Sequence, residues 1–241
     1  MKSFLKLLKS ELTDLYSYRI IVLVTVLTFV FAMAMGLFPE LNHSNFFYFN
    51  IFVLPVIIFS VSMFISRENN TLIPYVTGEQ KPLLYVFAKI IASVIVELIP
   101  IVAFIIMMRF TKIDIQYGWL FFAYLLGVIL HIIIAISVAI ISHKTTTLSI
   151  NYLAYIIVFS ASAILFSNGL IPLSSQYAML ISPAFLSAVL IDNILAGSAY
   201  SATWLIVLSV ILQFLYGSVL ILFVIRPYFK NYLMHFYNHQ S

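Results

Sequence analysis

Two ionisable residues interrupt apolar runs that are long enough to cross a bilayer. Glu97 lies in the run 83–108, and His131 lies in the run 119–141. A charge at mid-membrane costs about 2.5–3.5 kcal/mol, so each side chain must face protein or water. The pair could carry protons or bind a substrate. A neutral Glu97, bonded to His131 or to backbone near Pro100, would instead hold helices together, and we favour this interpretation because a protonated carboxyl needs no ion partner.

Two amide side chains could likewise have either a functional or a structural role. Asn151 lies with Tyr152 and Tyr155 in the run 148–166, and Gln213 lies in the run 203–225. Such residues could line a cavity, but hydrogen bonding between neighbouring helices is their more common role in membranes.

No motif for catalysis accompanies these residues. The stretch Gly78–Lys81 lacks the glycine spacing and the Ser or Thr of a phosphate-binding loop, and no zinc-protease or serine-hydrolase motif occurs. The absence of cysteine removes thiolate metal ligands and thiol nucleophiles. We therefore expect a protein that is not an enzyme, holds no metal, binds no nucleic acid, and moves or binds a molecule.

The composition explains what must position these residues. Of the 241 residues, 63% are hydrophobic and 8% are charged, whereas about a quarter are charged in soluble domains. One crossing needs about 20 apolar residues. We predict an all-α polytopic membrane protein, with a single transmembrane domain over residues 20–241 and six spans near 20–38, 46–65, 83–108, 119–141, 148–166 and 203–225.

Residues 1–19 have the pattern of an amphipathic helix that lies in the membrane interface. At 100° per residue, one face carries Phe4, Leu5, Leu8, Leu12 and Leu15, and Leu7 falls outside it. The opposite face, with Lys2, Lys6, Lys9 and Thr13, would point to anionic lipid headgroups. The alternative is a charged lead-in to the first span.

Residues 169–197 are apolar, yet they do not read as a seventh span. Pro172 and Pro183 interrupt the stretch, and Asp192 and Asn193 follow. Ser182 before Pro183 is typical of a helix N-terminus. We predict two short re-entrant helices on the outer side of the membrane.

The basic residues predict the orientation. With six spans and a cytoplasmic N-terminus, every lysine and arginine except Arg109 and Lys112 lies on the cytoplasmic side. A seventh crossing would place Arg226 and Lys230 outside. We therefore expect both termini in the cytoplasm.

The polar segment between the second and third predicted spans carries a resemblance. It begins Arg67-Glu68-Asn69-Asn70-Thr71-Leu72, continues to Lys81, and is followed by Lys89, which lies 18 residues after Thr71. This order resembles the membrane subunits of ABC-2-type ABC transporters, which have an Arg/Glu-rich turn, a Gly-Thr-Leu helix start and a lysine at this spacing. The family's glycine is Asn70 here, and the proline of its following turn is Glu79.

The resemblance covers the whole organisation and implies a function. Residues 66–81 would be the coupling segment, which docks in a groove of a separate ABC ATPase subunit. The ATPase would hold ATP and Mg, and this chain would need no cofactor. A second copy of the chain, or a related permease, would complete the assembly in the bacterial plasma membrane. The coupling residues would be Arg67, Glu68, Thr71, Leu72, Lys81 and Lys89.

The chain is also similar in size and composition to Firmicute permeases for antimicrobial peptides. We therefore expect an exporter of an amphipathic or hydrophobic substrate, with a peptide favoured. Two alternatives stay open: a proton- or ion-coupled transporter or channel that uses Glu97 and His131, and a membrane immunity protein that binds a peptide without transporting it.

Overall fold

The structure is a computed structural model that describes residues 2–38, 42–69, 82–110, 115–172, 175–195 and 203–229, without the side chains of residues 2, 3 and 82. Every regular element in these ranges is a helix. Within these ranges, six helices are long and apolar enough to cross a membrane. The predicted class is confirmed: the chain is an all-α, multi-pass membrane protein.

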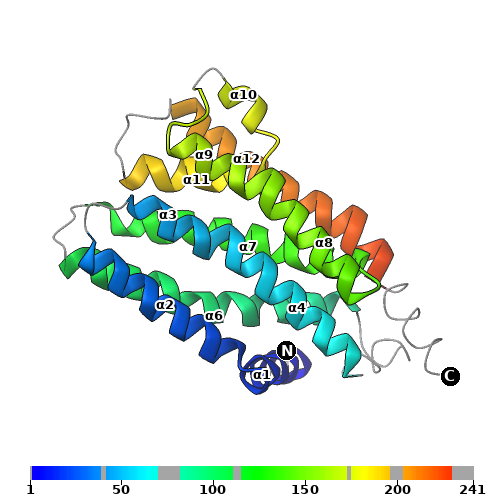
Figure 1. The fold of residues 1–241 in the computed structure, drawn as a ribbon. Coiled ribbons are helices and arrows are strands. Elements are labelled where there is room, and N and C mark those ends of the chain that lie inside the picture. Colours follow the sequence, from blue (N-terminus) through cyan, green and yellow to red (C-terminus); the bar gives the residue numbers. More distant parts are fainter. Residues whose placement is uncertain are drawn as a thin grey trace.

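The six spans run side by side in Figure 1. Three of them are continuous helices that contain a π-helical turn. In chain order, the spans are α2 (Ile20–Leu37), then α3 (His43–Tyr48) with η1 (Phe49–Val53) and α4 (Leu54–Glu68), then α6 (Pro82–Phe110), α7 (Tyr117–Ile141), α8 (Thr145–Tyr155) with η2 (Ile156–Ser160) and α9 (Ala161–Ser167), and finally α12 (Thr203–Val219) with η4 (Leu220–Ile225).

Most spans extend beyond the predicted apolar runs, because their helices continue into polar flanking residues. The second span is an example, since it begins at His43 and not near residue 46. The Asn42 side chain accepts a hydrogen bond from the Ser44 backbone N–H at 3.0 Å, which caps the helix at this point.

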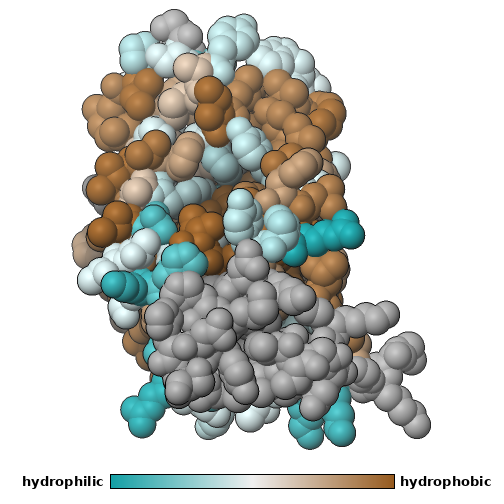
Figure 2. All heavy atoms as spheres, turned by 90° about the vertical axis from the view of Figure 1, so that its right-hand side faces the viewer, coloured by the Kyte–Doolittle hydropathy of each residue, from teal (hydrophilic) through white to brown (hydrophobic). Residues whose placement is uncertain are grey.

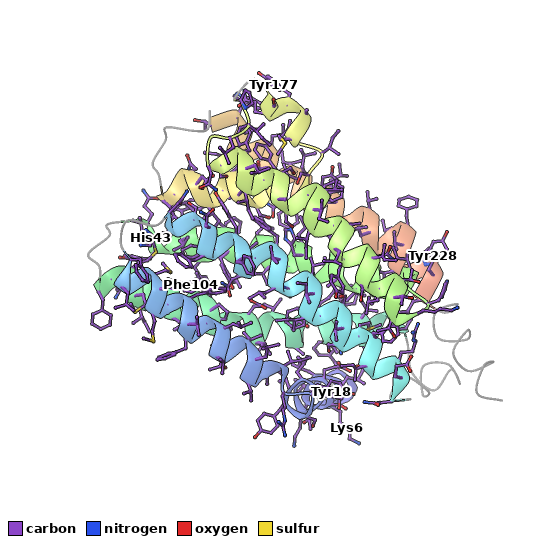
Figure 3. All side chains as sticks on the ribbon, viewed as in Figure 1. Lys6, Tyr18, His43, Phe104, Tyr177 and Tyr228 are labelled. Carbon is purple, nitrogen blue, oxygen red and sulfur yellow. The ribbon has the colours of Figure 1, made fainter. Side chains whose placement is uncertain are left out.

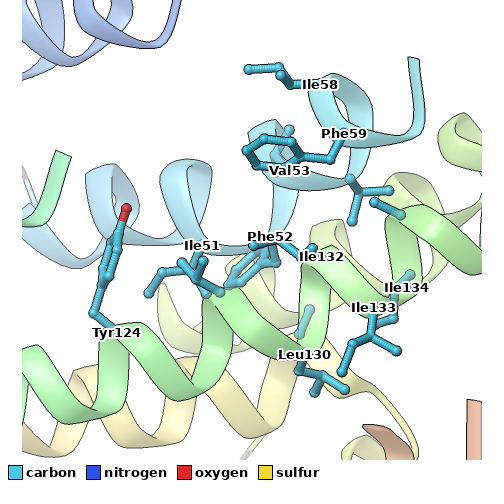
Figure 4. Close-up of a cluster of buried hydrophobic side chains, with 14 of the residues drawn as sticks. Ile51, Phe52, Val53, Ile58, Phe59, Tyr124, Leu130, Ile132, Ile133 and Ile134 are labelled. Carbon is cyan, nitrogen blue, oxygen red and sulfur yellow. The ribbon is translucent and has the colours of Figure 1, made fainter. Parts of the chain in front are cut away.

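Helix α7 is the centre of the bundle and packs against α4, α6, α11 and α12. Its inner face contributes Tyr124 and Leu130 to a cluster that includes Ile51 and Phe52 of the neighbouring span (Figure 4). Gly127 allows α7 to approach η1 closely: a Cβ there would lie 2.7 Å from a methyl carbon of Ile51. This contact fixes how α7 and η1 pack.

Helix α1 (Lys2–Ser17) is seen nearly end-on in Figure 1, at a steep angle to the spans. Arg19, with φ 59°, makes the corner between α1 and α2. The helix is amphipathic as predicted, but its buried face is rotated: Leu7 is buried and Leu5 is 56% exposed. The reason is that α1 packs on α6, which draws Glu11 into the contact.

Two shorter helices, α10 (Gln176–Met179) and α11 (Pro183–Leu195), lie between the fifth and sixth spans, and neither is long enough to cross a membrane. The predicted start at Ser182-Pro183 is confirmed. The Ser182 hydroxyl accepts from the Phe185 N–H at 3.2 Å and donates to the Phe159 carbonyl at 3.1 Å. Residues Pro183–Ile191 of α11 are buried among α3, α7, α9 and α12.

Candidate functional site

Polar residues gather at the end of the bundle where α1 lies, which we call the α1 end. Lys6, Tyr18 and Tyr228 lie toward it in Figure 3, and His43 and Tyr177 lie toward the opposite, α10 end. Figure 2 faces the side of the molecule on which α4 ends and α8 begins, and hydrophilic side chains gather across its lower half. Any soluble partner must meet the protein at a polar end of this kind.

Lys89 of α6 is the centre of this end, and its side chain is 0% exposed. Its ammonium lies 3.0 Å from a carboxylate oxygen of Glu11 on α1. The ammonium also donates to the Ser66 hydroxyl on α4 at 3.1 Å. One cation therefore joins three helices that are far apart in the sequence.

Burial raises the pKa of the Glu11 carboxyl above its ordinary value of 4.5, although the nearby Lys89 charge lowers it. Asp14, one turn further along α1, also has a pKa raised by burial and lowered by Lys89. The acidic side of α1 thus faces the cation on α6. The attraction offsets only part of the desolvation of Glu11, so the packing of α1 on α6 is what holds Glu11 inward.

Arg67 connects the end of α4 to the turn between α7 and α8. Its guanidinium donates to the backbone carbonyls of Ser142 and His143, at 3.2 and 3.1 Å, in the turn between α7 and α8. It also lies over the Phe64 ring and contacts Glu68 at 3.5 Å. The guanidinium thereby satisfies carbonyls at the end of α7 that have no partner within the helix.

The last described residues of α4 continue this set of contacts. Asn69 donates to the Tyr18 hydroxyl at 3.3 Å, while Glu68 is exposed. Together, Lys89, Glu11, Ser66 and Arg67 form what we call the Lys89 cluster. Of the predicted coupling residues, Arg67, Glu68 and Lys89 lie in or beside this cluster, and Thr71, Leu72 and Lys81 lie outside the described residues. The cluster connects the start of the predicted coupling segment to α1, α6 and the α7–α8 turn.

Glu97 and His131, predicted as a pair, have different partners. The Glu97 carboxylate accepts from the Tyr124 hydroxyl at 3.1 Å, within the buried contact of α6 with α7. His131 Nδ1 is 2.7 Å from the Gly127 carbonyl of its own helix. The expected bond from Glu97 to His131 is therefore replaced by one to Tyr124. His131 Nε2 has no hydrogen-bond partner among the described residues, and the ring packs against Phe52.

The two amides make the kind of hydrogen bond that the sequence favoured. Asn151 donates to the Ser142 hydroxyl at 2.9 Å, across the α7–α8 turn. Gln213 of α12 accepts from the Ser187 hydroxyl and donates to the Leu186 carbonyl, each at 3.4 Å. Gln213 also lines a cavity between α7 and α12.

Asp192 makes a second cluster at the α10 end. Its carboxylate accepts from the Ser167 hydroxyl at 2.6 Å and from the Tyr48 hydroxyl. Burial raises the pKa of Asp192, and these donors lower it. Beside them, the Asn168 amide donates to the Asn45 side chain at 3.0 Å. Helix α11 is thus attached to the start of the second span and the end of the fifth.

Sequence reasoning missed the roles of Glu11, Tyr124 and Asp192. Glu11 carried a usable signal, because an acidic residue lies between Leu7 and Leu15 at the helical spacing of four. Tyr124 and the hydroxyl partners of Asp192 carried none, since their contacts depend on how distant helices pack.

Comparison of the chain with models of protein families, with curated proteins and with solved structures gave no match.

Proposed function

We propose that the chain is the membrane subunit of an ATP-driven exporter of the ABC-2 type. The observation that carries this proposal is the Lys89 cluster, which joins the start of the coupling segment to α1, α6 and the α7–α8 turn. A soluble motor that pushes on residues 66–81 needs such a rigid connection to the spans. The six-span order and the short helix pair before the last span agree with this assignment.

The proposed mechanism is mechanical. ATP binding draws two ATPase subunits together beneath two copies of the membrane subunit, and the coupling segments move with them. Because Lys89 and Arg67 hold that segment to several helices, the displacement moves the helices as rigid bodies. The substrate route then opens on the far side.

The orientation and the substrate belong to the same proposal. The α1 end, which holds Lys6, Lys9 and Lys144, faces the cytoplasm of a bacterial plasma membrane. An amphipathic or hydrophobic substrate, with a peptide favoured, suits spans whose buried side chains are mainly apolar and whose buried polar groups are mostly serine hydroxyls. ATP hydrolysis belongs to the separate subunit, so this chain itself is not an enzyme.

Co-expression with an ABC ATPase from the same genome tests the proposal. Thr71→Arg and Leu72→Asp should abolish co-purification and ATP-dependent export, because a charge in the docking segment prevents seating in the ATPase groove. Thr145→Arg is the matched control, since Thr145 is exposed at the same end of the bundle. Unchanged binding and export in the Thr71 and Leu72 variants would reject the coupling role.

Reconstitution of the chain alone separates this function from the ion-coupled alternative. The proposed exporter is idle in vesicles without its ATPase, with or without a proton gradient. Gradient-driven transport by the chain alone would favour a secondary transporter.

A further inference from the structure

A line of polar side chains runs through the interior of the bundle on α6. Lys89, Ser93 and Glu97 recur at every fourth residue, so they lie on one face of that helix. Their exposed fractions are 0%, 0% and 1%. Successive members are about 6 Å apart along the helix axis. The line therefore leads from the α1 end toward the middle of the membrane.

The face of α4 that meets this line is also polar. Ser66 accepts from the Lys89 ammonium at 3.1 Å, and Ser62, one helical turn deeper on the same face, is 0% exposed. Ser93 is likewise one turn deeper than Lys89, so Ser62 and Ser93 follow the Lys89–Ser66 bond on the two helices. We call these facing residues, Lys89, Ser93 and Glu97 with Ser66 and Ser62, the α4–α6 seam.

Two hydroxyls of the seam, Ser62 Oγ and Ser93 Oγ, have no hydrogen-bond partner among the described residues. Buried serines elsewhere in the spans bond to a carbonyl of their own helix, as Ser60 does to Ile57 at 3.0 Å. Buried polar groups without a protein partner are usually paired with ordered water. One water molecule can join groups about 6 Å apart, because each O···O distance is about 2.8 Å. The two hydroxyls therefore point to water as their ligand.

Thr28 of α2 adds a third such hydroxyl. Its Oγ1 has no hydrogen-bond partner among the described residues, and it lies on the buried face of α2, which packs against α6. A Cβ on Gly36 would lie 2.6 Å from the Met107 methyl, so these two residues are level with each other. Thr28 is eight residues before Gly36, and Ile99 is eight before Met107, in helices that both start at the α1 end. Thr28 therefore lies at about the depth of Glu97.

The α1 end of the seam reaches the protein surface. Glu11 lies 3.0 Å from the Lys89 ammonium, and its side chain is 6% exposed. Asp14, one turn further along α1, is partly exposed. Charged groups at the edge of the bundle bind water, so water is available where the seam begins.

Beyond Glu97, the same face of α6 is apolar. Phe104 is two turns further along and packs edge-on against Phe47, with the ring centroids 5.1 Å apart. The Phe47 ring in turn lies 6.4 Å from the Tyr124 ring, and all three rings are 0% exposed. In Figure 3, Phe104 lies toward the labelled His43, on the α10 side of the bundle. The seam is polar toward the α1 end and closed by aromatic rings toward the α10 end.

We propose that the α4–α6 seam holds a file of water molecules that runs from Lys89 to Glu97 and ends there. The file keeps the Glu97 carboxyl in proton exchange with the α1 end only. Because the Phe104 and Phe47 rings close the other end, the file by itself carries no proton across the membrane. It involves no ATPase, so it stands or falls separately from the transport function.

Solid-state NMR tests the file directly, by polarisation transfer from water protons to the protein. The full chain is reconstituted in bilayers with carbon-13-labelled serine, and each serine signal is identified by its loss in an alanine variant. We expect fast transfer at Ser62 and Ser93, close to that at the exposed Ser10. Ser60 should show slow transfer and is the matched control, because it is equally buried on α4 and bonded within its helix. Transfer at Ser62 and Ser93 as slow as at Ser60 overturns the proposal.

A valine substitution tests whether the file is continuous. Ser93→Val removes the hydroxyl between Lys89 and Glu97, so water transfer to the labelled Glu97 carboxyl carbon should fall to the level of Ser60. Ser60→Val makes the same change at a buried serine on the other side of α4 and should leave transfer to Glu97 unchanged. Equal transfer to Glu97 in the wild type and in Ser93→Val overturns the seam as the route. Unchanged melting temperatures show that both variants are folded.

The closed end of the file has its own test. Water transfer to the ring carbons of Phe104, identified by their loss in Phe104→Leu, should be as slow as transfer to Ser60. Transfer at Phe104 as fast as at Ser93 would show that water passes Glu97, and it would overturn the one-sided proton exchange.

Discussion

At the scale of single residues, Lys89 is the side chain whose loss should have the largest effect. Lys89→Met keeps the volume of the stem but leaves the Glu11 carboxylate buried without its cation. Removing one partner of a buried ion pair costs roughly 3–5 kcal/mol. We expect a lower melting temperature in detergent and α1 to become accessible to protease. The double variant Lys89→Met with Glu11→Leu should recover most of the loss, and failure to recover would show that the pair is not the cause.

Glu11 contributes to the pH dependence of the stability of the wild-type protein. Its pKa is raised in the folded state, so that state holds the proton more tightly than the unfolded chain. Stability from this group is therefore fully present below about pH 4.5 and is lost as pH rises through the raised pKa. In Lys89→Met the lowering effect of the cation is gone, and the loss should extend to higher pH. Melting curves at several pH values measure this. In the control Lys89→Met/Glu11→Leu, the part of the pH dependence that comes from Glu11 should be absent.

Glu97 should be replaceable, while its partner should not. Glu97→Gln keeps an oxygen that accepts from Tyr124, so the melting temperature and the proposed ATP-driven export should change little. Tyr124→Phe leaves the buried carboxyl without a donor and should cost roughly 1–3 kcal/mol. Loss of export in Glu97→Gln, with normal folding, would instead support a proton-carrying role.

The hydrogen-bond partner of Glu97 is a feature that the sequence alone could not predict. Tyr124 and His131 are seven residues apart, which is two turns along the same face of α7 and about 10 Å. Either could meet Glu97, depending on the axial register of α6 against α7. The packing of the whole length of α6 on α7 sets that register, and no local pattern in the sequence encodes it.

At the scale of elements, the spans were predictable because a helix that crosses the hydrocarbon core needs a long run of apolar residues. The start of α11 was predictable too, because Ser182 and Pro183 act through local backbone geometry. The π-helical turns η1, η2 and η4 were not predicted, although proline gives a signal for two of them. Pro55 lies two residues after the end of η1, and Pro227 lies two residues after the end of η4. Proline has no N–H to donate within a helix, so the regular hydrogen bonds are interrupted at these points.

Helix α11 makes the prediction that belongs to this scale. It is anchored at one end by the Ser182 cap and at the other by Asp192, which accepts from Tyr48 and Ser167. Asp192→Leu leaves the Ser167 hydroxyl without its acceptor and leaves Tyr48 only the Ser167 hydroxyl, and it should cost roughly 1–3 kcal/mol. Hydrogen exchange should rise in α11 more than in α7. An equal rise of hydrogen exchange in all helices would show that α11 does not open independently of the bundle.

At the scale of the whole molecule, the two ends of the bundle must lie on opposite sides of the membrane. Side-chain contacts fix which residues share an end: Asn42 bonds to Asn168 at the α10 end, and Arg67 bonds to His143 at the α1 end. The basic residues at the α1 end then predict that it faces the cytoplasm.

The absence of native cysteine makes this orientation directly measurable. Asn42→Cys should react with a membrane-impermeant maleimide added to intact cells, because its end of the bundle faces outward. Lys144→Cys, in the exposed turn after α7, should react only after the membrane is permeabilised. Ser198→Cys should behave as Asn42→Cys does, because the chain between the fifth and sixth spans cannot change sides without a further crossing. Labelling of Ser198→Cys from the cytoplasm alone would require a seventh crossing, which would carry Arg226 to the outer side against the charge rule. It would also place the two ends of the last span opposite to the arrangement on which the coupling mechanism depends.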